Sequence, residues 1–279
     1  MDGMQPVVMG VVNVTPDSFS DGGAWATTDA AVVHGRRLLD EGATVLDVGG
    51  ESTRPGATPV GEDEELARIV PVIEALAPTV AAAGGRISVD TRHAGVAWIA
   101  LAAGATILND VSASLEDVAA DAGAAWIAMH MQGEPATMQL RPAYDDVVEE
   151  VRDALAAAAA RGRAAGVDEC WVDPGIGFGK SFDHNWALLA HLDQVVALGV
   201  PVVVGTSRKG FLGEALATAD RVDAPVPVGD RLEGSVTTAL WAATMGAQML
   251  RVHDVRDTVR ALLASGTTTV GVPAAGSDR

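Results

Sequence analysis

The sequence predicts an α/β protein of the (β/α)8, or TIM-barrel, class, built as a single domain. Three observations predict this fold. Eight short apolar runs of strand length recur along the 279 residues, and amphipathic, alanine-rich stretches of helical length lie between them. The runs are continuously apolar, which is typical of strands buried on both faces in a parallel sheet. Each run is also followed by polar residues, so we expect the active site in one cavity at the carboxyl ends of the strands.

The expected strands, in chain order, are residues 7–12, 45–46, 87–89, 107–108, 126–129, 171–172, 202–204 and 249–250. The polar residues that follow them are, in the same order, Asn13, Asp47, Asp90, Asn109, His130, Asp173, Ser207 and Arg251. A doubly wound open sheet is the main competing fold. It usually carries one dominant glycine-rich first turn rather than polar residues after every strand, so the pattern favours the barrel.

The expected helices separate these strands. They lie at 28–41, 62–83, 93–103, 145–165, 185–198, 232–245 and 255–264, and one more follows Ser114-Leu-Glu-Asp117, which resembles a capping box. A glycine stands between helix and strand at seven places, where it supplies a left-handed cap: Gly42, Gly84, Gly104, Gly123, Gly166, Gly199 and Gly246. We expect the domain to span residues 1–264 and the tail at 265–279 to be flexible, because it is rich in Gly, Thr, Ser and Pro.

Composition narrows the class of function. The net charge of −18 argues against a nucleic acid or an anionic membrane as partner, since both would be repelled. No uncharged apolar run reaches the roughly 18 residues of a membrane span, and no basic segment with a hydrophobic stretch opens the chain. The single cysteine, Cys170, lies in an apolar strand, where we expect an inert buried thiol. These features indicate a cytoplasmic enzyme.

Two long loops follow the first two strands. Residues 13–23 mix carboxylates, hydroxyls and one aromatic side chain, and residues 49–56 place a cation among small residues. Such loops predict a lid over the site, with a solvated connector as the alternative.

Asp90, Asn109 and Asp173 form a different group at three strand ends. Carboxylates accept from ring and exocyclic N–H groups, and a carboxamide both donates and accepts, so the three suit a flat, nitrogen-rich ring. A metal cluster is the rival use of the two aspartates, but metal sites usually need more carboxylates or histidines at close spacing. Helix capping would explain each of the three alone, but it fits the three strand ends together less well.

Cations dominate the remaining strand ends. Lys209 follows the seventh strand, Arg251 and His253 follow the eighth, and Arg54 lies in the second long loop. The last two loops of a barrel commonly bind phosphate. In so acidic a chain, this group predicts an anionic ligand such as a phosphate or diphosphate, although any single cation could also pair with a surface carboxylate.

The sequence resembles the dihydropteroate synthase family over essentially the whole chain to about residue 262. The resemblance rests on motifs that occur in order, each at a strand end. They are MGVVNVTPDSFSDGG at 9–23, GGESTRPG at 49–56, SVDT at 88–91, NDV at 109–111, MHMQG at 129–133, DPGIGFGK at 173–180, SRK at 207–209 and RVHDV at 251–255.

The resemblance implies a transferase of folate biosynthesis that condenses 6-hydroxymethyl-7,8-dihydropterin diphosphate with 4-aminobenzoate to give 7,8-dihydropteroate and diphosphate. It implies that the pterin ring is held by Asp90, Asn109, Met129, Asp173, Phe178 and Lys209. Asn13, Arg251 and His253 would hold the diphosphate, and Asn13 would also help to place Mg2+, the expected cofactor. Phe19, Thr53, Arg54, Pro55 and Ser207 would line the 4-aminobenzoate pocket, where sulfonamide drugs would compete.

The resemblance further implies a dissociative reaction and a homodimer. Asp173 and Asp90 would favour the cation left on the methylene carbon, Lys209 would act beside them, and Asp21 on the lid would steady the cation or the incoming amine. The apolar residues within 232–245 permit a homodimer through the late helices. Two alternatives stay open: a pterin-dependent methyltransferase-type barrel, and a catalytically silent paralogue that only binds pterin. A sugar-phosphate isomerase would use the cations but not the group of Asp90, Asn109 and Asp173.

Overall fold

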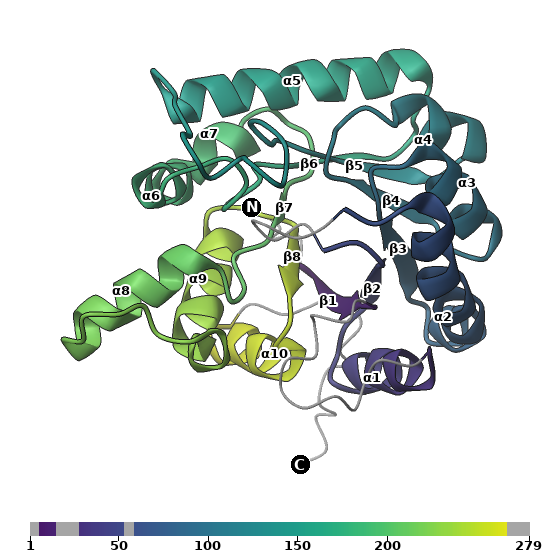
Figure 1. The fold of residues 1–279 in the computed structure, drawn as a ribbon, viewed down its shortest axis with the longest axis horizontal. Coiled ribbons are helices and arrows are strands. Elements are labelled where there is room, and N and C mark those ends of the chain that lie inside the picture. The colour runs from purple at the N-terminus through teal and green to yellow at the C-terminus, as the bar shows by residue number, and fades with distance from the viewer. Residues whose placement is uncertain (1–5, 15–27, 53–58, 267–279) are drawn as a thin grey trace.

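A ring of eight parallel strands surrounded by helices forms the fold (Figure 1). The computed structural model describes residues 6–14, 28–52 and 59–266. The strands are β1 Val7–Asn13, β2 Val45–Gly49, β3 Arg86–Asp90, β4 Ile107–Asp110, β5 Ala125–Met129, β6 Cys170–Asp173, β7 Val203–Val204 and β8 Met249–Val252. The helices are α1 Thr28–Asp40, α2 Glu62–Ala82, α3 Ala94–Ala102, α4 Glu116–Ala122, α5 Val147–Ala165, α6 Phe182–Ala190, α7 Leu192–Val196, α8 Gly210–Asp220, α9 Leu232–Thr244 and α10 Val255–Ala264.

The strand order closes the barrel, as predicted. The sheet runs β6-β5-β4-β3-β2-β1-β8-β7, and every pairing in it is parallel. A single bridge between Val172 and Val202 joins the two edge strands, and the Val172 amide donates to the Pro201 carbonyl at 2.9 Å. All eight strands therefore end at the same rim, which is the condition for one shared site.

Apolar side chains fill both faces of the strands. The inside of the barrel holds a small cluster made of Met9, Val45, Ile107, Ala125, Ile127, Val203 and Met249. A larger cluster fills the space between the strands and the helices and includes Leu46, Ile73 and Leu108. This two-sided burial explains why the strands are continuously apolar in the sequence.

The seven glycines expected between helix and strand all have positive φ, from 63° at Gly123 to 122° at Gly104. The left-handed caps predicted from the sequence are therefore confirmed.

The late helices differ from the prediction. The stretch expected as one helix at 185–198 is two helices, because the chain leaves helical geometry at His191 (φ −117°, ψ 30°). α6 also begins three residues earlier, behind a capping box in which Ser181 accepts from the His184 amide and the His184 ring accepts from the Ser181 amide.

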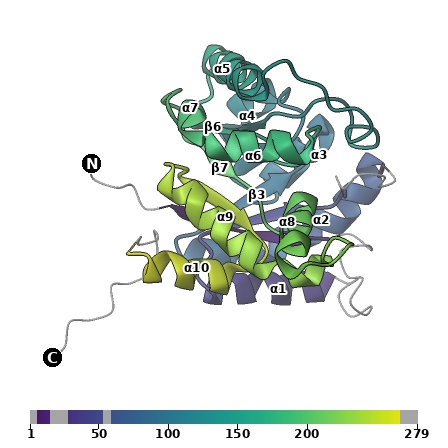
Figure 2. The ribbon, with the colours of Figure 1, turned by 90° about the vertical axis from the view of Figure 1, so that its left-hand side faces the viewer.

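Helix α8 was not predicted. Two glycines in its first turn, Gly210 and Gly213, lower its intrinsic helix propensity. It packs beside α9 instead, as Figure 2 shows, with Leu212 close to Gly234. The Arg231 guanidinium lies where a side chain on Gly213 would be, which explains the glycine there. Tertiary packing, rather than local sequence preference, makes this helix.

The prediction of a capping box at Ser114–Asp117 is wrong. α4 begins at Glu116 and has no side-chain cap from Ser114. The buried Asp110 carboxylate organises this turn, because it accepts from the amides of Ser112, Ser114 and Leu115 at 2.7–2.9 Å. It also accepts from the Trp126 indole at 3.1 Å. A strand-end aspartate has therefore taken over the capping role.

We expect Asp110→Ala to lower the free energy of unfolding by about 3 kcal/mol or more, because it leaves several backbone amides and a buried indole N–H without an acceptor. Chemical denaturation followed by tryptophan fluorescence measures the change. Asp117→Ala, on the exposed face of α4, is the matched control and should change stability by less than about 0.5 kcal/mol. Equal stability of the two variants would contradict this role of Asp110.

In the described part of the chain, no helix combines the length and apolarity that crossing a membrane would require. Helix α10 ends at Ala264, and residues 267–279 of the predicted tail lie outside the described residues.

Candidate active site

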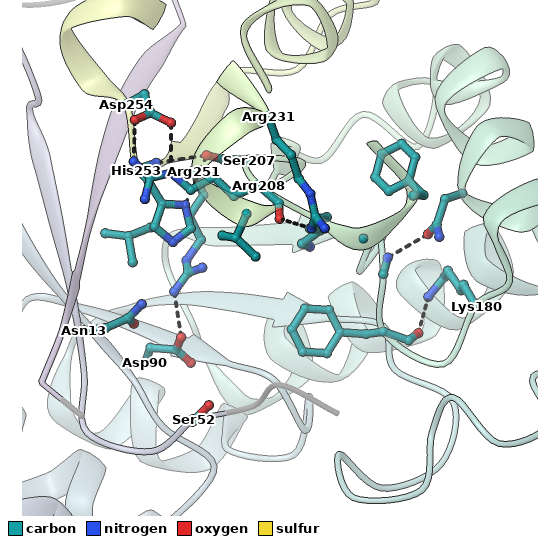
Figure 3. A pocket seen from close by; sticks show the side chains of 18 of the residues that line it. Asn13, Ser52, Asp90, Lys180, Ser207, Arg208, Arg231, Arg251, His253 and Asp254 are labelled. Atoms are coloured by element: carbon teal, nitrogen blue, oxygen red, sulfur yellow. Dashed lines mark hydrogen bonds and ion pairs between the residues drawn. The ribbon is translucent and has the colours of Figure 1, made fainter. Parts of the chain in front are cut away.

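A cavity of about 1350 Å³ lies at the carboxyl ends of the strands (Figure 3). Its lining includes seven residues predicted for the site: Asn13, Asp90, Phe178, Ser207, Lys209, Arg251 and His253. Three more predicted residues, Asn109, Met129 and Asp173, are buried at the ends of β4, β5 and β6 on the same rim. The remaining five, Phe19, Asp21, Thr53, Arg54 and Pro55, lie outside the described residues. The cavity therefore brings the predicted pterin and diphosphate residues to one rim of the barrel.

Arg251 connects three strands at this rim. Its Nε donates to Asp47 Oδ2 at 2.6 Å, and its Nη2 donates to Asp90 Oδ2 at 2.8 Å (Figure 3 shows the second bond). The guanidinium thus reaches from β8 across β1 to β2 and β3. Burial alone lowers the pKa of Arg251, but the two carboxylates outweigh burial and hold the pKa above its usual range. Arg251 is therefore a permanent positive charge in the site.

Asp47 lies beneath the cavity and is fully buried. Besides Arg251, its Oδ2 accepts from Asn109 Nδ2 at 3.2 Å. One carboxylate oxygen therefore orients both a residue predicted to hold the ring and a residue predicted to hold the diphosphate. The sequence placed Asp47 only at a strand end and did not reveal these two partners.

The two predicted ring carboxylates are less acidic than usual. Burial raises the pKa of Asp90 to about 7, although Arg251 opposes this shift. Burial also raises the pKa of Asp173, against the opposing effect of Lys209 and of the Gly175 amide, which donates to Asp173 Oδ1 at 2.7 Å. Carboxylates that are poorly solvated gain most from a ligand that donates N–H groups to them.

Lys209 lies between β7 and α8 and lines the cavity. Its ammonium donates to the Ile176 carbonyl and lies 4.8 Å from the centre of the Phe178 ring. Burial lowers its pKa to about 8, and Asp173 partly offsets the shift. The lysine and the aromatic ring therefore form one wall of the site, next to Asp173.

Ser207 and His253 join the ends of β7 and β8. Ser207 Oγ accepts from the His253 amide at 3.1 Å and lies 3.0 Å from His253 Nδ1. Arg208, between the two site residues Ser207 and Lys209, has a left-handed backbone (φ 61°) and binds Asp254 through Nε and Nη2 at 3.1 and 2.6 Å. These contacts group Ser207 with the cations near Arg251.

The glycine-rich segment 173–180 is packed closely against its surroundings. Gly175 and Gly179 have positive φ, and a Cβ on either would collide with a backbone carbonyl, that of His130 or Gln132 respectively. Side chains hold the segment from outside: Asn185 accepts from the Gly177 amide, Gln139 donates to the Gly177 carbonyl, and Tyr144 donates to the Gly179 carbonyl. The glycines therefore allow a backbone that other residues could not adopt.

Arg231 is a cavity residue that the sequence did not indicate. It lies between α8 and α9, away from any strand end, and it donates to the carbonyls of Val226 and Arg208 at 2.9 and 3.0 Å. It belongs to none of the motifs found at the strand ends, so the sequence carried no signal for it.

The types of side chain at the site suit an organic substrate better than a metal cluster. Within residues 6–14, 28–52 and 59–266, no group of three or more His, Cys, Asp or Glu side chains is placed to hold a metal ion. Buried carboxylates and a carboxamide lie beside cations at this rim, since Arg251 binds Asp90 and Lys209 lies near Asp173. Such a set of side chains suits a ring rich in N–H groups joined to an anionic group.

Comparison with known proteins agrees with this arrangement. The family model described as "Pterin binding enzyme" matches residues 9–253. A dihydropteroate synthase of Mycobacterium leprae is 49% identical over 267 residues, which cover 93% of this chain and 92% of that protein.

The chain belongs to the dihydropteroate synthase family.

Solved structures of dihydropteroate synthases have the same fold. The Xanthomonas albilineans enzyme with 4-aminobenzoic acid superposes with a TM-score of 0.85 at 47% identity, covering 94% of this chain and 92% of that chain. The same organism's enzyme in complex with 7,8-dihydropteroate has a TM-score of 0.81 at 44% identity, covering 95% and 94%. The predicted barrel and the family resemblance are thereby confirmed.

Proposed function

We propose that this dihydropteroate synthase family member condenses 6-hydroxymethyl-7,8-dihydropterin diphosphate with 4-aminobenzoate, giving 7,8-dihydropteroate and diphosphate. The meeting of buried carboxylates, a carboxamide and cations at one rim of the barrel carries the proposal. Related enzymes whose structures contain 4-aminobenzoic acid or 7,8-dihydropteroate support it. Asp90, Asn109 and Asp173 accept from and donate to the pterin ring, while Arg251 and His253 hold the diphosphate.

The reaction separates charge within this site. As the bond from the methylene carbon to the diphosphate breaks, the electron-rich pterin shares the positive charge, and the carboxylates of Asp90 and Asp173 stabilise it. The negative charge that develops on the departing diphosphate meets Arg251 and His253, which are already positioned there. The amine of 4-aminobenzoate is unprotonated at neutral pH and attacks the carbon without a strong general base.

Mg2+ is the proposed cofactor, and the residues present fit it. Asn13 ends β1 and points toward Asp90 and Arg251 in the cavity (Figure 3), so its carboxamide oxygen supplies one hard ligand. Mg2+ commonly takes few protein ligands and fills its coordination with substrate phosphates and water, which agrees with the lack of a carboxylate cluster among the described residues. Bound there with diphosphate, the ion would neutralise charge on the leaving group.

The deciding experiment is a diphosphate-release assay with pterin diphosphate, with and without 4-aminobenzoate and Mg2+. We expect release that depends on both, and inhibition by a sulfonamide that added 4-aminobenzoate relieves. Pterin binding by calorimetry without release would instead identify a silent paralogue. Release that does not depend on 4-aminobenzoate would contradict the proposed acceptor.

The pH dependence of kcat/KM should follow the protonation of Lys209. Its pKa is lowered to about 8, so its charge is present below that pH and is lost as the pH rises through it. We expect kcat/KM for pterin diphosphate to fall above about pH 8. Lys209→Arg keeps the charge, so its profile should stay flat to higher pH, even if its absolute rate is lower. An identical alkaline limb in both proteins would assign the limb to another group.

The family resemblance also implies a homodimer through the late helices. Trp241 on α9 is 47% exposed, and its indole donates to the Leu189 carbonyl of α6. Phe182 and Trp186 on α6 are also exposed, so both helices carry exposed aromatic side chains. Sedimentation equilibrium of the protein and of Trp241→Glu tests this, and a wild-type monomer at micromolar concentration would refute it.

A further inference from the structure

The chain contains only two lysines, Lys180 and Lys209, against seventeen arginines. Both lie at the same rim of the barrel and line the same cavity. Lys209 already has a place in the proposed reaction, whereas Lys180 does not. Because nearly every other positively charged side chain is an arginine, the lysine at position 180 indicates that this place requires the compact ammonium group.

Lys180 is almost completely buried, with 1% of its surface exposed. Its Nζ lies 2.9 Å from His130 Nδ1 and donates to the carbonyls of His130 and Phe178 at 3.3 and 3.0 Å (Figure 3 shows the bond to Phe178). Three acceptors match the three N–H groups of one ammonium. A planar guanidinium is larger and points its donors in one plane, so it would not serve these three atoms.

His130 is a suitable acceptor because it is neutral. Burial, and then the charge of Lys180, lower the pKa of His130 to about 3. A neutral imidazole that accepts at Nδ1 carries its proton at Nε2. Burial lowers the pKa of Lys180 to about 7, and in its charged form Lys180 donates to the neutral His130 ring.

The Phe178 carbonyl is the link from Lys180 to the site. The Phe178 amide donates to the Gly175 carbonyl at 3.0 Å, and the Gly175 amide donates to Asp173 Oδ1 at 2.7 Å. The ring of Phe178 lies beside the Lys209 ammonium. A group that fixes the Phe178 carbonyl thus fixes, within one tight turn, the direction of the Asp173 carboxylate and of the Phe178 ring.

We infer that Lys180 is a positioning residue for pterin binding: it ties the glycine-rich segment 173–180 to His130 at the end of β5 and so presents Asp173 and Phe178 to the ring. This role rests on the proposed function, because it concerns the same ring site. Lys180 itself is buried beneath the segment and acts through these two residues. Its positive charge also lies near Asp173 and favours the ionised carboxylate there.

Lys180→Met, which keeps the length of the side chain, and Lys180→Arg, which keeps the charge, test the inference by steady-state kinetics. We expect kcat/KM for pterin diphosphate to fall about 30-fold in both, because neither side chain can donate to the three acceptors of the Lys180 ammonium. KM for 4-aminobenzoate should change less than about threefold. Arg163→Met, which removes an exposed cation of α5, is the matched control and should behave as wild type. Folded Lys180→Met with wild-type kcat/KM would overturn the inference, as would equal losses for both substrates.

A second measurement uses the wild-type protein and does not require Lys180 variants to fold. Protein grown with lysine labelled with 13C at the ε-carbon gives two lysine signals, and Lys209→Met assigns them. We expect the Lys180 signal to shift when 6-hydroxymethyl-7,8-dihydropterin binds, because Asp173 and Phe178 transmit the contact. A Lys180 signal that stays unchanged at ring saturation would overturn the inference. Wild-type protein that neither binds this pterin nor turns over would instead count against the proposed function.

Discussion

Asp173→Asn is expected to lower kcat by about 10³-fold while leaving the protein folded, a loss equivalent to about 4 kcal/mol of transition-state stabilisation. Asp173 is 5% exposed, and its Oδ1 is occupied by the Gly175 amide at 2.7 Å. An asparagine oxygen can still accept from Gly175, so the turn is preserved. The other carboxylate oxygen, however, becomes an NH2 group, which cannot accept from the ring N–H groups and cannot stabilise the developing cation.

The control for this variant is Asp183→Asn on the exposed first turn of α6, which makes the same chemical change ten residues away. It should leave kcat within about twofold of wild type. Circular dichroism and thermal melting of both variants check that the fold is intact. Near-normal product formation by Asp173→Asn would remove Asp173 from the pterin site and contradict the arrangement of buried carboxylates on which the proposed function rests.

The barrel was predictable because its physical cause is local and repeated. A strand covered on both faces is mostly apolar, and residues at its carboxyl end lie at the rim, so a run such as 107–108 followed by Asn109 indicates both the strand and the site. The glycine caps were predictable for the same reason, since a helix that turns into a strand needs a left-handed residue at one place.

Features that depend on distant contacts were not predictable. Asp110 takes the place of the expected capping box by accepting from three amides of its own turn, and it also accepts from the Trp126 indole of the next strand. Helix α8 forms against α9 in spite of its glycines. The sequence placed Asp47 at a strand end and Lys180 in a glycine-rich motif, but their partners, Arg251 and His130, are 204 and 50 residues away. The sequence therefore shows that a residue lies at the rim, and only the folded structure shows which side chains it contacts.

Asp47→Asn is the second large effect that we expect, although Asp47 does not line the cavity. The substitution keeps the volume of the side chain but removes its charge. Two donors, Arg251 Nε and Asn109 Nδ2, would then compete for a single amide oxygen. Breaking one side of a buried charge pair should lower the free energy of unfolding by about 3 kcal/mol. Arg251 and Asn109 would also lose their fixed directions, so kcat/KM for pterin diphosphate should fall about 10²-fold, mainly through KM.

Ser88→Ala is the matched control for Asp47→Asn. Ser88 is the neighbour of Asp47 in the β2–β3 register and is equally buried, and its hydroxyl has no hydrogen-bond partner among the described residues. Removing it should therefore cost less than about 1 kcal/mol and leave KM unchanged. If Asp47→Asn and Ser88→Ala raised KM equally, the effect would come from the barrel interior in general. If only Asp47→Asn raised KM, and the increase were smaller in an Asn109→Ala background, one buried carboxylate would be setting the geometry of both halves of the site.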